Sequence, residues 1–352
     1  MISTSRTSDF QISGSAISSH KNIHSIDFIK GILIILVFFG HLICGNQRTT
    51  FLRYIIYSFH MPIFIGISGF LFNIKKKPKE MIKYYLNRIV IPWCIAVLGY
   101  YFVNIAFSGW HFSFREVLRN FVFPWYHLWF VLGLLSYIIF TYIGCNLKIK
   151  RKGMKTLTIV IIAAFISLVS QWDLFGNLKN TGCQGIYSFL RVLQLNKLVF
   201  FVFGFYLRQI YEQKGYLIGN RRKGIMIVCS FINIFVTVAI FPYQYVNLEK
   251  VLLFTLNIPL LYWVLDYGLK AHTHKCRIIE WMGVYSYPLY LYHILACLLG
   301  QVLAEQGSVK YYMVGSLGGI GLCIGIALLK ENKLLARFVF GIVRKDALKI
   351  KE

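Results

Sequence analysis

Lys30 and His41 lie in one apolar segment, residues 26–45, eleven positions apart. In an α-helix, eleven steps of about 100° make roughly three turns, so both side chains project from one face. At about 1.5 Å of rise per residue they stand roughly 16 Å apart, about half the thickness of a bilayer's hydrocarbon core. Ionisable side chains are rare and costly inside a membrane span. Two of them on one face therefore indicate a path or a reaction site within the membrane.

The two side chains suit different chemistry. A neutral imidazole can accept a proton from a hydroxyl, which makes His41 a candidate general base. A site facing the interior of a helix bundle is shielded from water, and such shielding favours acyl transfer over hydrolysis. The structural alternative for His41 is a packing histidine that hydrogen-bonds a neighbouring carbonyl. Lys30 can bind an anion, or Asp27, three residues earlier, can neutralise it as a local ion pair.

Four further positions carry candidate roles, each with a structural alternative. His60 is expected at a similar depth to His41, where the two would line a shared polar pocket, or it anchors in the interfacial aromatic belt. Arg88 is a candidate to bind a phosphate through two N–H groups of its planar guanidinium, or it is a simple positive anchor at the inner surface. Trp129 belongs to an aromatic cluster that stacks on a sugar or anchors at the interface. His293 is deep enough to need a partner, in structure or in function.

Metal and nucleotide motifs are absent from the sequence. It contains no GxSxG elbow, Walker loop, HExxH pair or Cys/His cluster with metal-ligand spacing. No metal is predicted.

The composition is that of a polytopic membrane protein. Hydrophobic residues make up 57% of the 352 positions and charged residues only 14%, and the mean hydropathy is +0.61. Soluble domains carry nearer a quarter charged residues. The net charge of +25 would suggest nucleic acid in a soluble protein. Here its distribution follows the membrane topology, so no nucleic-acid role is expected.

The sequence predicts an all-α bundle of about ten transmembrane helices with both termini in the cytoplasm. The leader, the tail and every second connection carry 28 of the 38 Lys and Arg residues, and the positive-inside rule places them in the cytoplasm. The expected parts are a flexible cytoplasmic leader (1–24), a transmembrane domain (25–330) and a basic cytoplasmic tail (331–352). The leader lacks the apolar core of a signal peptide. The predicted spans are 26–45, 54–73, 86–107, 121–144, 156–172, 190–211, 224–242, 248–268, 280–303 and 311–330.

Five short motifs, in consistent order over residues 24–300, resemble the membrane-bound acyltransferase family 3, which includes O-acetyltransferases of bacterial surface glycans. Each motif alone is weak, and their order makes the match specific. They are Ile26-Asp27-Phe28-Ile29-Lys30-Gly31 with Gly40-His41, Phe59-His60-Met61-Pro62-Ile63-Phe64 with Ser68-Gly69-Phe70, Arg88-Ile89-Val90-Ile91-Pro92, His127-Leu128-Trp129-Phe130, and Gly283-Val284-Tyr285-Ser286 through Tyr290-Leu291-Tyr292-His293.

The resemblance implies a multi-pass protein of the bacterial inner membrane. It would transfer an acetyl or other short acyl group from cytoplasmic acetyl-CoA to a hydroxyl of a surface or lipid-linked glycan. Lys30 and Arg88 would hold the acyl-CoA, and His41 would be the general base. The acceptor would contact a second set of residues, namely His60, Trp129 and His293.

The sequence departs from the family pattern at three points. Lys30 stands where the family usually has arginine, which keeps the charge but loses the planar fork. A second arginine often precedes the one matched by Arg88, and residues 84–87 contain none. Many relatives also carry a C-terminal SGNH-type hydrolase-like domain. This sequence is expected to lack one, so the membrane bundle would complete the transfer or pass its product on.

Two other classes of function stay open at this stage. Ten spans with charge inside the membrane also suit a transporter of a glycan or a lipid-linked intermediate, although no paired broken helices mark two corresponding halves. A non-catalytic membrane receptor would leave the alignment of Lys30 and His41 unexplained.

Overall fold

The structure is a computed structural model that describes residues 11–46, 49–74, 77–109, 111–125, 127–148, 152–180, 182–217, 220–243, 246–270 and 276–342. These ranges contain helices and no strand, which confirms the predicted all-α class. The α-helices are α1 (Gln11–Leu42), α2 (Phe51–Leu71), α3 (Pro78–Tyr85), α4 (Ile91–Ser108), α5 (Phe114–Val122), α6 (Trp129–Cys145), α7 (Lys152–Gln171), α8 (Gln184–Val192), α9 (Leu198–Lys214), α10 (Asn220–Ile240), α11 (Val246–Lys270), α12 (Arg277–Val284), α13 (Ser286–Leu303) and α14 (Val309–Leu329).

Short helices of other geometry join several of these. Two are π-helical, η1 (Leu86–Val90) between α3 and α4, and η5 (Leu335–Val339) after α14. Three are 3₁₀ helices, η2 (Gly176–Asn180), η3 (Leu195–Lys197) and η4 (Phe241–Tyr243).

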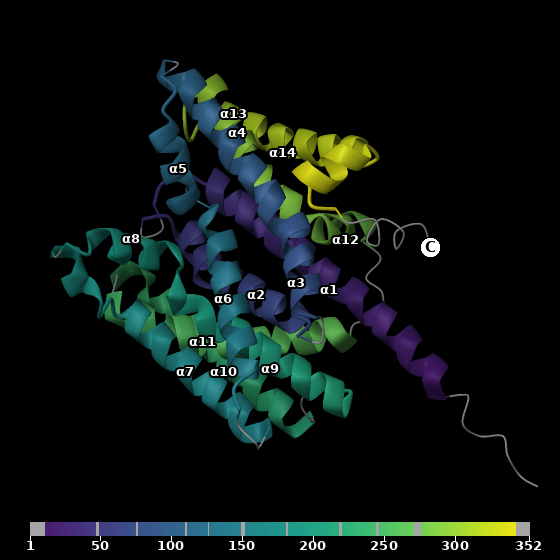
Figure 1. Cartoon of the computed structure of the whole chain (residues 1–352). Helices are drawn as coiled ribbons and strands as arrows, with labels where there is room; N and C mark the ends of the chain where they lie inside the picture. Colours follow the sequence, from purple (N-terminus) through teal and green to yellow (C-terminus); the bar gives the residue numbers. More distant parts are fainter. Residues whose placement is uncertain are drawn as a thin grey trace, which may run out of the picture.

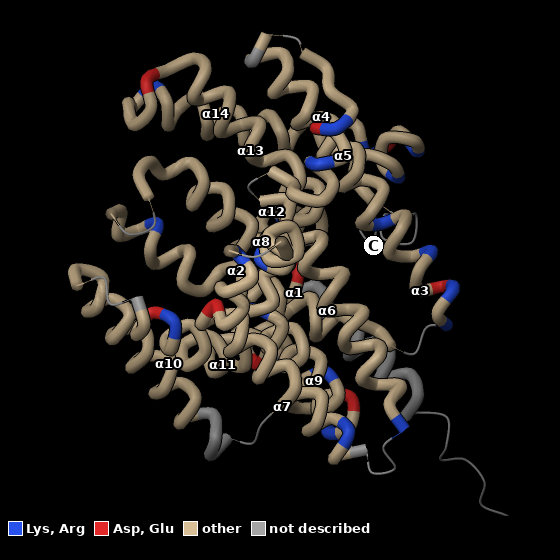
Figure 2. Tube along the Cα trace, turned by 60° about the vertical axis from the view of Figure 1, so that its left-hand side comes forward, with Lys and Arg blue, Asp and Glu red and all other residues tan. Residues whose placement is uncertain are grey.

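The helices form a multi-pass membrane bundle. Eight helices in the described part of the chain are long and apolar enough to cross a membrane, and the 17-residue α6 is apolar but shorter. α1 carries the first predicted span and begins earlier, within the predicted leader. Figure 1 shows the helices packed side by side, and Figure 2 shows long stretches of helix without charge between charged ends. The count of ten spans and their orientation stay predictions.

Three of the predicted spans are interrupted. The fourth span was predicted from residue 121, which is wrong, because α5 ends at Val122 and α6 begins only at Trp129. Pro124 lies in this break and has no N–H to continue a helix. The sixth span is broken between α8 and α9, where Gln194 has a left-handed φ of 49°. The ninth is broken between α12 and α13, at Tyr285.

Glycines set the closest helix crossings. A Cβ on Gly31 of α1 would overlap the Ile279 carbonyl of α12, and α2 and α9 meet in the same way through Gly69 and Gly204. Small residues let helix backbones approach closely, which favours dispersion contacts in a membrane where lipid is as apolar as the side chains. These crossings fix α1 and α2, which carry most of the candidate site, against the rest of the bundle.

Candidate active site

Two cavities lie at opposite ends of the same helices. The larger, here called the histidine cavity, has a volume of about 410 Å³ and is lined by His41 near the end of α1 and by His60 in the first half of α2. The smaller, here called the basic cavity, has about 150 Å³ and is lined by Lys30 of α1 and by Arg88 of η1.

The two cavities meet at a shared wall. Val37, Met61 and Tyr290 line both. Val37 lies between Lys30 and His41 in the sequence of α1, so the wall falls between the two ends of the predicted path. Methionine has three rotatable bonds and adapts its shape readily, which makes Met61 the part of this wall best able to open.

His41 is the best placed base for chemistry in the histidine cavity. Its Nδ1 lies 3.3 Å from the Tyr57 hydroxyl, and Arg53 donates to that hydroxyl from 3.4 Å. Arg53 is itself tied to the Ile43 carbonyl at 3.1 Å. The Tyr57 oxygen can accept from both Arg53 and the His41 Nδ1–H. That tautomer leaves Nε2 as the basic nitrogen of His41.

A backbone carbonyl sets the tautomer of His60. Its Nδ1 donates to the Ile56 carbonyl, 2.6 Å away on the preceding turn of α2, because a carbonyl oxygen can only accept. Its ring is 5.0 Å from the Tyr57 ring, edge to face. His60 is 3% exposed but lines the cavity. It therefore presents a rigid polar edge beside His41.

Two more histidines pack against His41. The His293 ring is centred 5.1 Å from His41, and the His127 ring is 4.8 Å from His293. His127 donates from Nε2 to the Leu291 carbonyl at 3.2 Å, and His293 donates from Nδ1 to the Tyr290 carbonyl at 2.7 Å. Their other ring nitrogens are buried and have no hydrogen-bond partner among the described residues. Two lone pairs thus lie in the cluster around His41.

Among the described residues, no three His, Cys, Asp or Glu side chains converge in a way that could hold a metal ion. In each histidine one ring nitrogen forms a hydrogen bond with a carbonyl or a hydroxyl. This arrangement suits proton transfer by the other nitrogen.

The basic cavity combines two cations with an apolar wall. Lys30 forms an ion pair of 2.8 Å with Asp27, so the local pair considered from the sequence is present. Arg88 lies on the π-helical turn η1, and its guanidinium is 5.5 Å from the Tyr84 ring centre. Single π-helical turns are frequent at functional sites, because they re-aim side chains. Asp27 offsets the charge of Lys30, and Arg88 adds a second cation to the lining of this cavity.

The structure groups the six predicted site residues into three sets. His41, His60 and Trp129 line the histidine cavity, while Lys30 and Arg88 line the basic cavity. Trp129 starts α6 and faces the cavity beside Lys197, whose ammonium is 5.3 Å from its ring centre. His293 is different. It packs behind His41 and is not among the residues that line either cavity.

Sequence reasoning overlooked three residues of the site. The spacing of Tyr57 could have identified it as a site residue, because it lies three residues before His60 and so on the same face of α2. His127 stands in the same motif as Trp129 and was given no role of its own. Lys197 falls in the predicted span 190–211 and was also given no role. Its place in the cavity depends on the break between α8 and α9, which the periodicity did not reveal.

The family model described as an acyltransferase domain matches residues 23–329. The chain belongs to this acyltransferase family. The match covers every helix from the second half of α1 to α14, and the residues that line both cavities lie within it. As a member of the family, the chain is an acyltransferase that takes its acyl group from a donor.

Curated relatives are distant. A "probable poly-beta-1,6-N-acetyl-D-glucosamine export protein" of Staphylococcus aureus (strain MSSA476) is 22% identical over 295 residues, which cover 80% of this chain and 82% of the relative. The nodulation protein NolL of Sinorhizobium fredii is 33% identical over 126 residues, 31% of this chain and 34% of the relative. No solved structure matches the chain.

Proposed function

We propose that the protein transfers an acetyl or other short acyl group from cytoplasmic acyl-CoA to a hydroxyl of a surface or lipid-linked glycan, in a bacterial inner membrane. One observation carries this proposal. The basic cavity and the histidine cavity meet end to end at Val37, Met61 and Tyr290. A donor held by its phosphates at one end can therefore present its thioester to a base at the other.

The basic cavity suits the donor. Coenzyme A is an anion with several phosphates on a long flexible arm. Arg88 offers a planar fork for a phosphate, and Lys30 adds a second cation beside Asp27. The lining beyond them is largely apolar, with Val37, Met61 and others, and this suits an uncharged arm. In the predicted orientation this end faces the cytoplasm, where acyl-CoA is made.

The histidine cavity suits the chemical step. His41 Nε2 takes the proton of the glycan hydroxyl while the oxygen of that hydroxyl attacks the thioester carbonyl. The carbon–sulfur bond then breaks, the acyl ester forms, and the thiolate of coenzyme A takes the proton from His41. The Nδ1–H of His41 donates a hydrogen bond to the Tyr57 oxygen throughout, and this keeps Nε2 turned to the cavity. His60 and Trp129 would contact the sugar, and His293 supports the His41 ring.

The names of the relatives support a glycan as acceptor. One is named for a polymer of N-acetyl-glucosamine and the other for nodulation. The first name also favours a second candidate, export of a glycan without modification. Two cavities at opposite ends of one bundle suit both candidates, whereas a positioned imidazole is needed only for transfer.

Labelled acetyl-CoA separates the two candidates. Inverted membrane vesicles that contain the protein are incubated with acetyl-CoA labelled in the acetyl group and with the host's glycan fraction. Transfer predicts label in the glycan that mild alkali releases, because esters are alkali-labile. Vesicles without the protein give the background. Movement of unlabelled glycan across the membrane, with no ester formed, would contradict the proposal and support export.

A further inference from the structure

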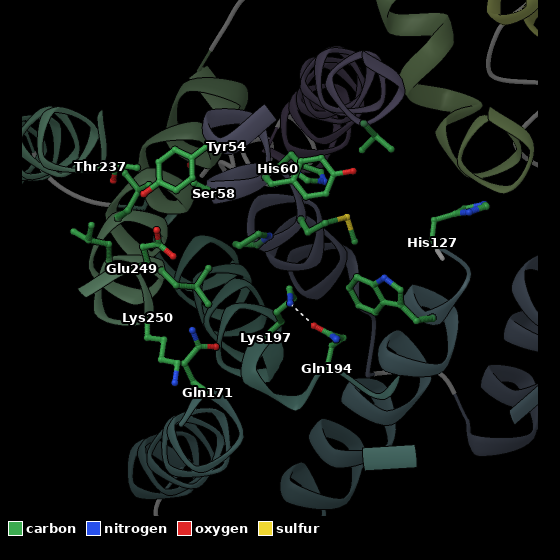
Figure 3. A pocket seen from close by; sticks show the side chains of 18 of the residues that line it. Tyr54, Ser58, His60, His127, Gln171, Gln194, Lys197, Thr237, Glu249 and Lys250 are labelled. Atoms are coloured by element: carbon green, nitrogen blue, oxygen red, sulfur yellow. Dashed lines mark hydrogen bonds between the residues drawn. The ribbon is translucent and has the colours of Figure 1, made fainter. Parts of the chain in front are cut away.

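The histidine cavity has a second polar side, away from His41. Gln194 and Lys197 reach it from the break between α8 and α9, Gln171 from the end of α7, and Glu249 and Lys250 from the start of α11. Figure 3 shows Gln171, Gln194, Lys197 and Lys250 on the side of this space opposite Tyr54, with Glu249 between Tyr54 and Lys250. The proposed reaction gives none of them a role.

Lys197 is the best held of these groups. Its ammonium donates to Gln194 Oε1 at 2.6 Å and to Asn196 Oδ1 at 3.4 Å, and it lies over the ring of Trp129. Asn196 in turn donates to Gln171 Oε1 at 2.7 Å. These contacts fix the ammonium at the cavity wall.

Backbone strain supports this arrangement. Gln194 has a φ of 49°, a conformation that non-glycine residues seldom adopt. The turn that it creates ends α8, and the 3₁₀ helix η3 then brings Lys197 to the cavity before α9 begins. Strained positions of this kind are costly and tend to cluster at functional sites.

Within the described residues, no carboxylate balances the charge of Lys197. Its hydrogen-bond acceptors are neutral amides, and it forms no ion pair with any carboxylate in the described ranges. It lies within a segment that is apolar enough to span a membrane, where an unpaired charge is costly. An ammonium has three N–H donors, and two of them are engaged, so the third is available to a ligand in the cavity.

The other charges leave this side positive. Its ionic side chains are two lysines, Lys197 and Lys250, and one acid, Glu249. The side-chain amides of Gln171 and Gln194 can donate a hydrogen bond to a hydroxyl or accept one from it. A neutral sugar would satisfy the amides but leave the Lys197 charge uncompensated, whereas an acidic sugar would satisfy both.

We propose that the side of the histidine cavity centred on Lys197 binds an acidic group, a carboxylate or a phosphate, on the acceptor glycan. This inference rests on the proposed function, because it takes the cavity to be the acceptor site. The acidic group docks on Lys197, with Lys250 adding to the attraction. Hydroxyls of the same glycan reach the amides, and the hydroxyl to be acylated points toward His41.

Equilibrium binding tests this subsite without relying on catalysis. The probes are one fluorescent trisaccharide in three forms, with a glucuronic acid, with that carboxyl reduced to an alcohol, and with a phosphate monoester on that alcohol. Each is titrated against the purified protein in detergent. We expect the charged probes to bind about tenfold more tightly than the reduced probe, as one charge-assisted hydrogen bond would give. Whichever charged probe binds more tightly identifies the source of the acidic group.

Variants assign the preference to Lys197. Lys197→Met should remove it by weakening the charged probes alone, and Lys197→Arg should keep it. Glu249→Gln should strengthen the binding of the charged probes. Lys310→Met, at an exposed position in the first turn of α14, is the matched control. Thermal unfolding shows whether Lys197→Met still folds. If it does not, Lys197→Arg and Glu249→Gln decide the question.

Equal binding of all three probes by the parent protein would overturn the inference, and so would an equal loss for all three in Lys197→Met. The transfer assay is read separately. Charge-selective binding without any acyl transfer would reject the proposed function and leave the subsite standing. Acyl transfer without charge-selective binding would reject the subsite and leave the proposed function standing.

Discussion

The two cavities differ in their lining: one is rich in hydrogen-bonded polar groups, and the other is mainly apolar with two cations. In the histidine cavity hydrogen bonds hold His41, His60 and Lys197, and residues from α1, α2, α6, α7, η3, α10, α11 and α13 line it. The basic cavity is smaller and mainly apolar, and its two cations, Lys30 and Arg88, come from α1 and η1. A site that performs a proton transfer needs fixed geometry, whereas a site that holds a charged donor needs charge and a smooth path. The contrast matches chemistry at one end and donor binding at the other.

The largest expected effect tests the chemical end. His41→Ala should lower transfer by about 10²–10⁴-fold, the usual contribution of a general base. Its fold should survive, because the only hydrogen bond of the ring within the described residues is the one with Tyr57. The measurement is the rate of ester formation from labelled acetyl-CoA, with His111→Ala, an exposed histidine before α5, as the control. Normal transfer by His41→Ala would remove His41 from the mechanism.

The shared wall provides the next test. Met61→Trp places a larger, stiffer side chain between the cavities, and we expect transfer to fall about 100-fold, because near-attack geometry is lost. Binding of coenzyme A should change little, since Arg88 and Lys30 are untouched. Isothermal titration measures the binding. Met61→Leu, which nearly conserves volume, should retain transfer. An unchanged rate in Met61→Trp would show that the donor reaches His41 by another route.

Arg88 tests the donor end. Arg88→Met should raise KM for acyl-CoA about tenfold or more and leave KM for the glycan unchanged, because a charge-assisted hydrogen bond to phosphate contributes about 1.5–3 kcal/mol. Arg88→Lys should recover part of the loss, since it keeps the charge without the fork. Steady-state kinetics with each substrate varied in turn measure both constants. Arg115→Met, on the exposed α5, is the control. An equal rise in both KM values would deny the separation of the two ends.

The smallest effect sharpens the assignment within the histidine cavity. Tyr57→Phe removes the oxygen that faces His41 Nδ1 but keeps the ring beside His60. We expect kcat to fall about three- to tenfold, the effect of one neutral hydrogen bond, with KM for acyl-CoA unchanged. Tyr206→Phe, on the exposed side of α9, is the matched control. A rise in KM for acyl-CoA would mean that Tyr57 acts on the donor.

The sequence predicted much of the fold because apolar length is a local property. Each of the ten predicted segments corresponds to helix in the structure, and the errors occur at breaks. Lys197 and His127 owe their positions to such breaks, after Gln194 and around Pro124. Hydropathy is averaged over a window of residues. It therefore cannot detect a single residue whose backbone adopts the left-handed conformation. The periodicity therefore located the helices and not the turns that open them to the cavity.

For the site, the sequence by itself determined that Lys30 and His41 share one helix face, because a helix fixes the relative direction of its own side chains. It also determined that Asp27 could pair with Lys30, as the structure shows. Only the tertiary structure decided which residues from other helices surround them. His293 was expected to touch the acceptor, and the packing of α13 against α1 places it behind His41.

The same limit applies to the path between Lys30 and His41. Their spacing of eleven residues follows from the sequence, but the wall between them is made by Val37, Met61 and Tyr290, from three different helices. Contacts between helices depend on where small residues such as Gly31 and Gly69 allow close approach, and on the breaks that turn a helix end inward. Local pattern fixed the ends of the path, and only long-range packing decided that two cavities meet between them.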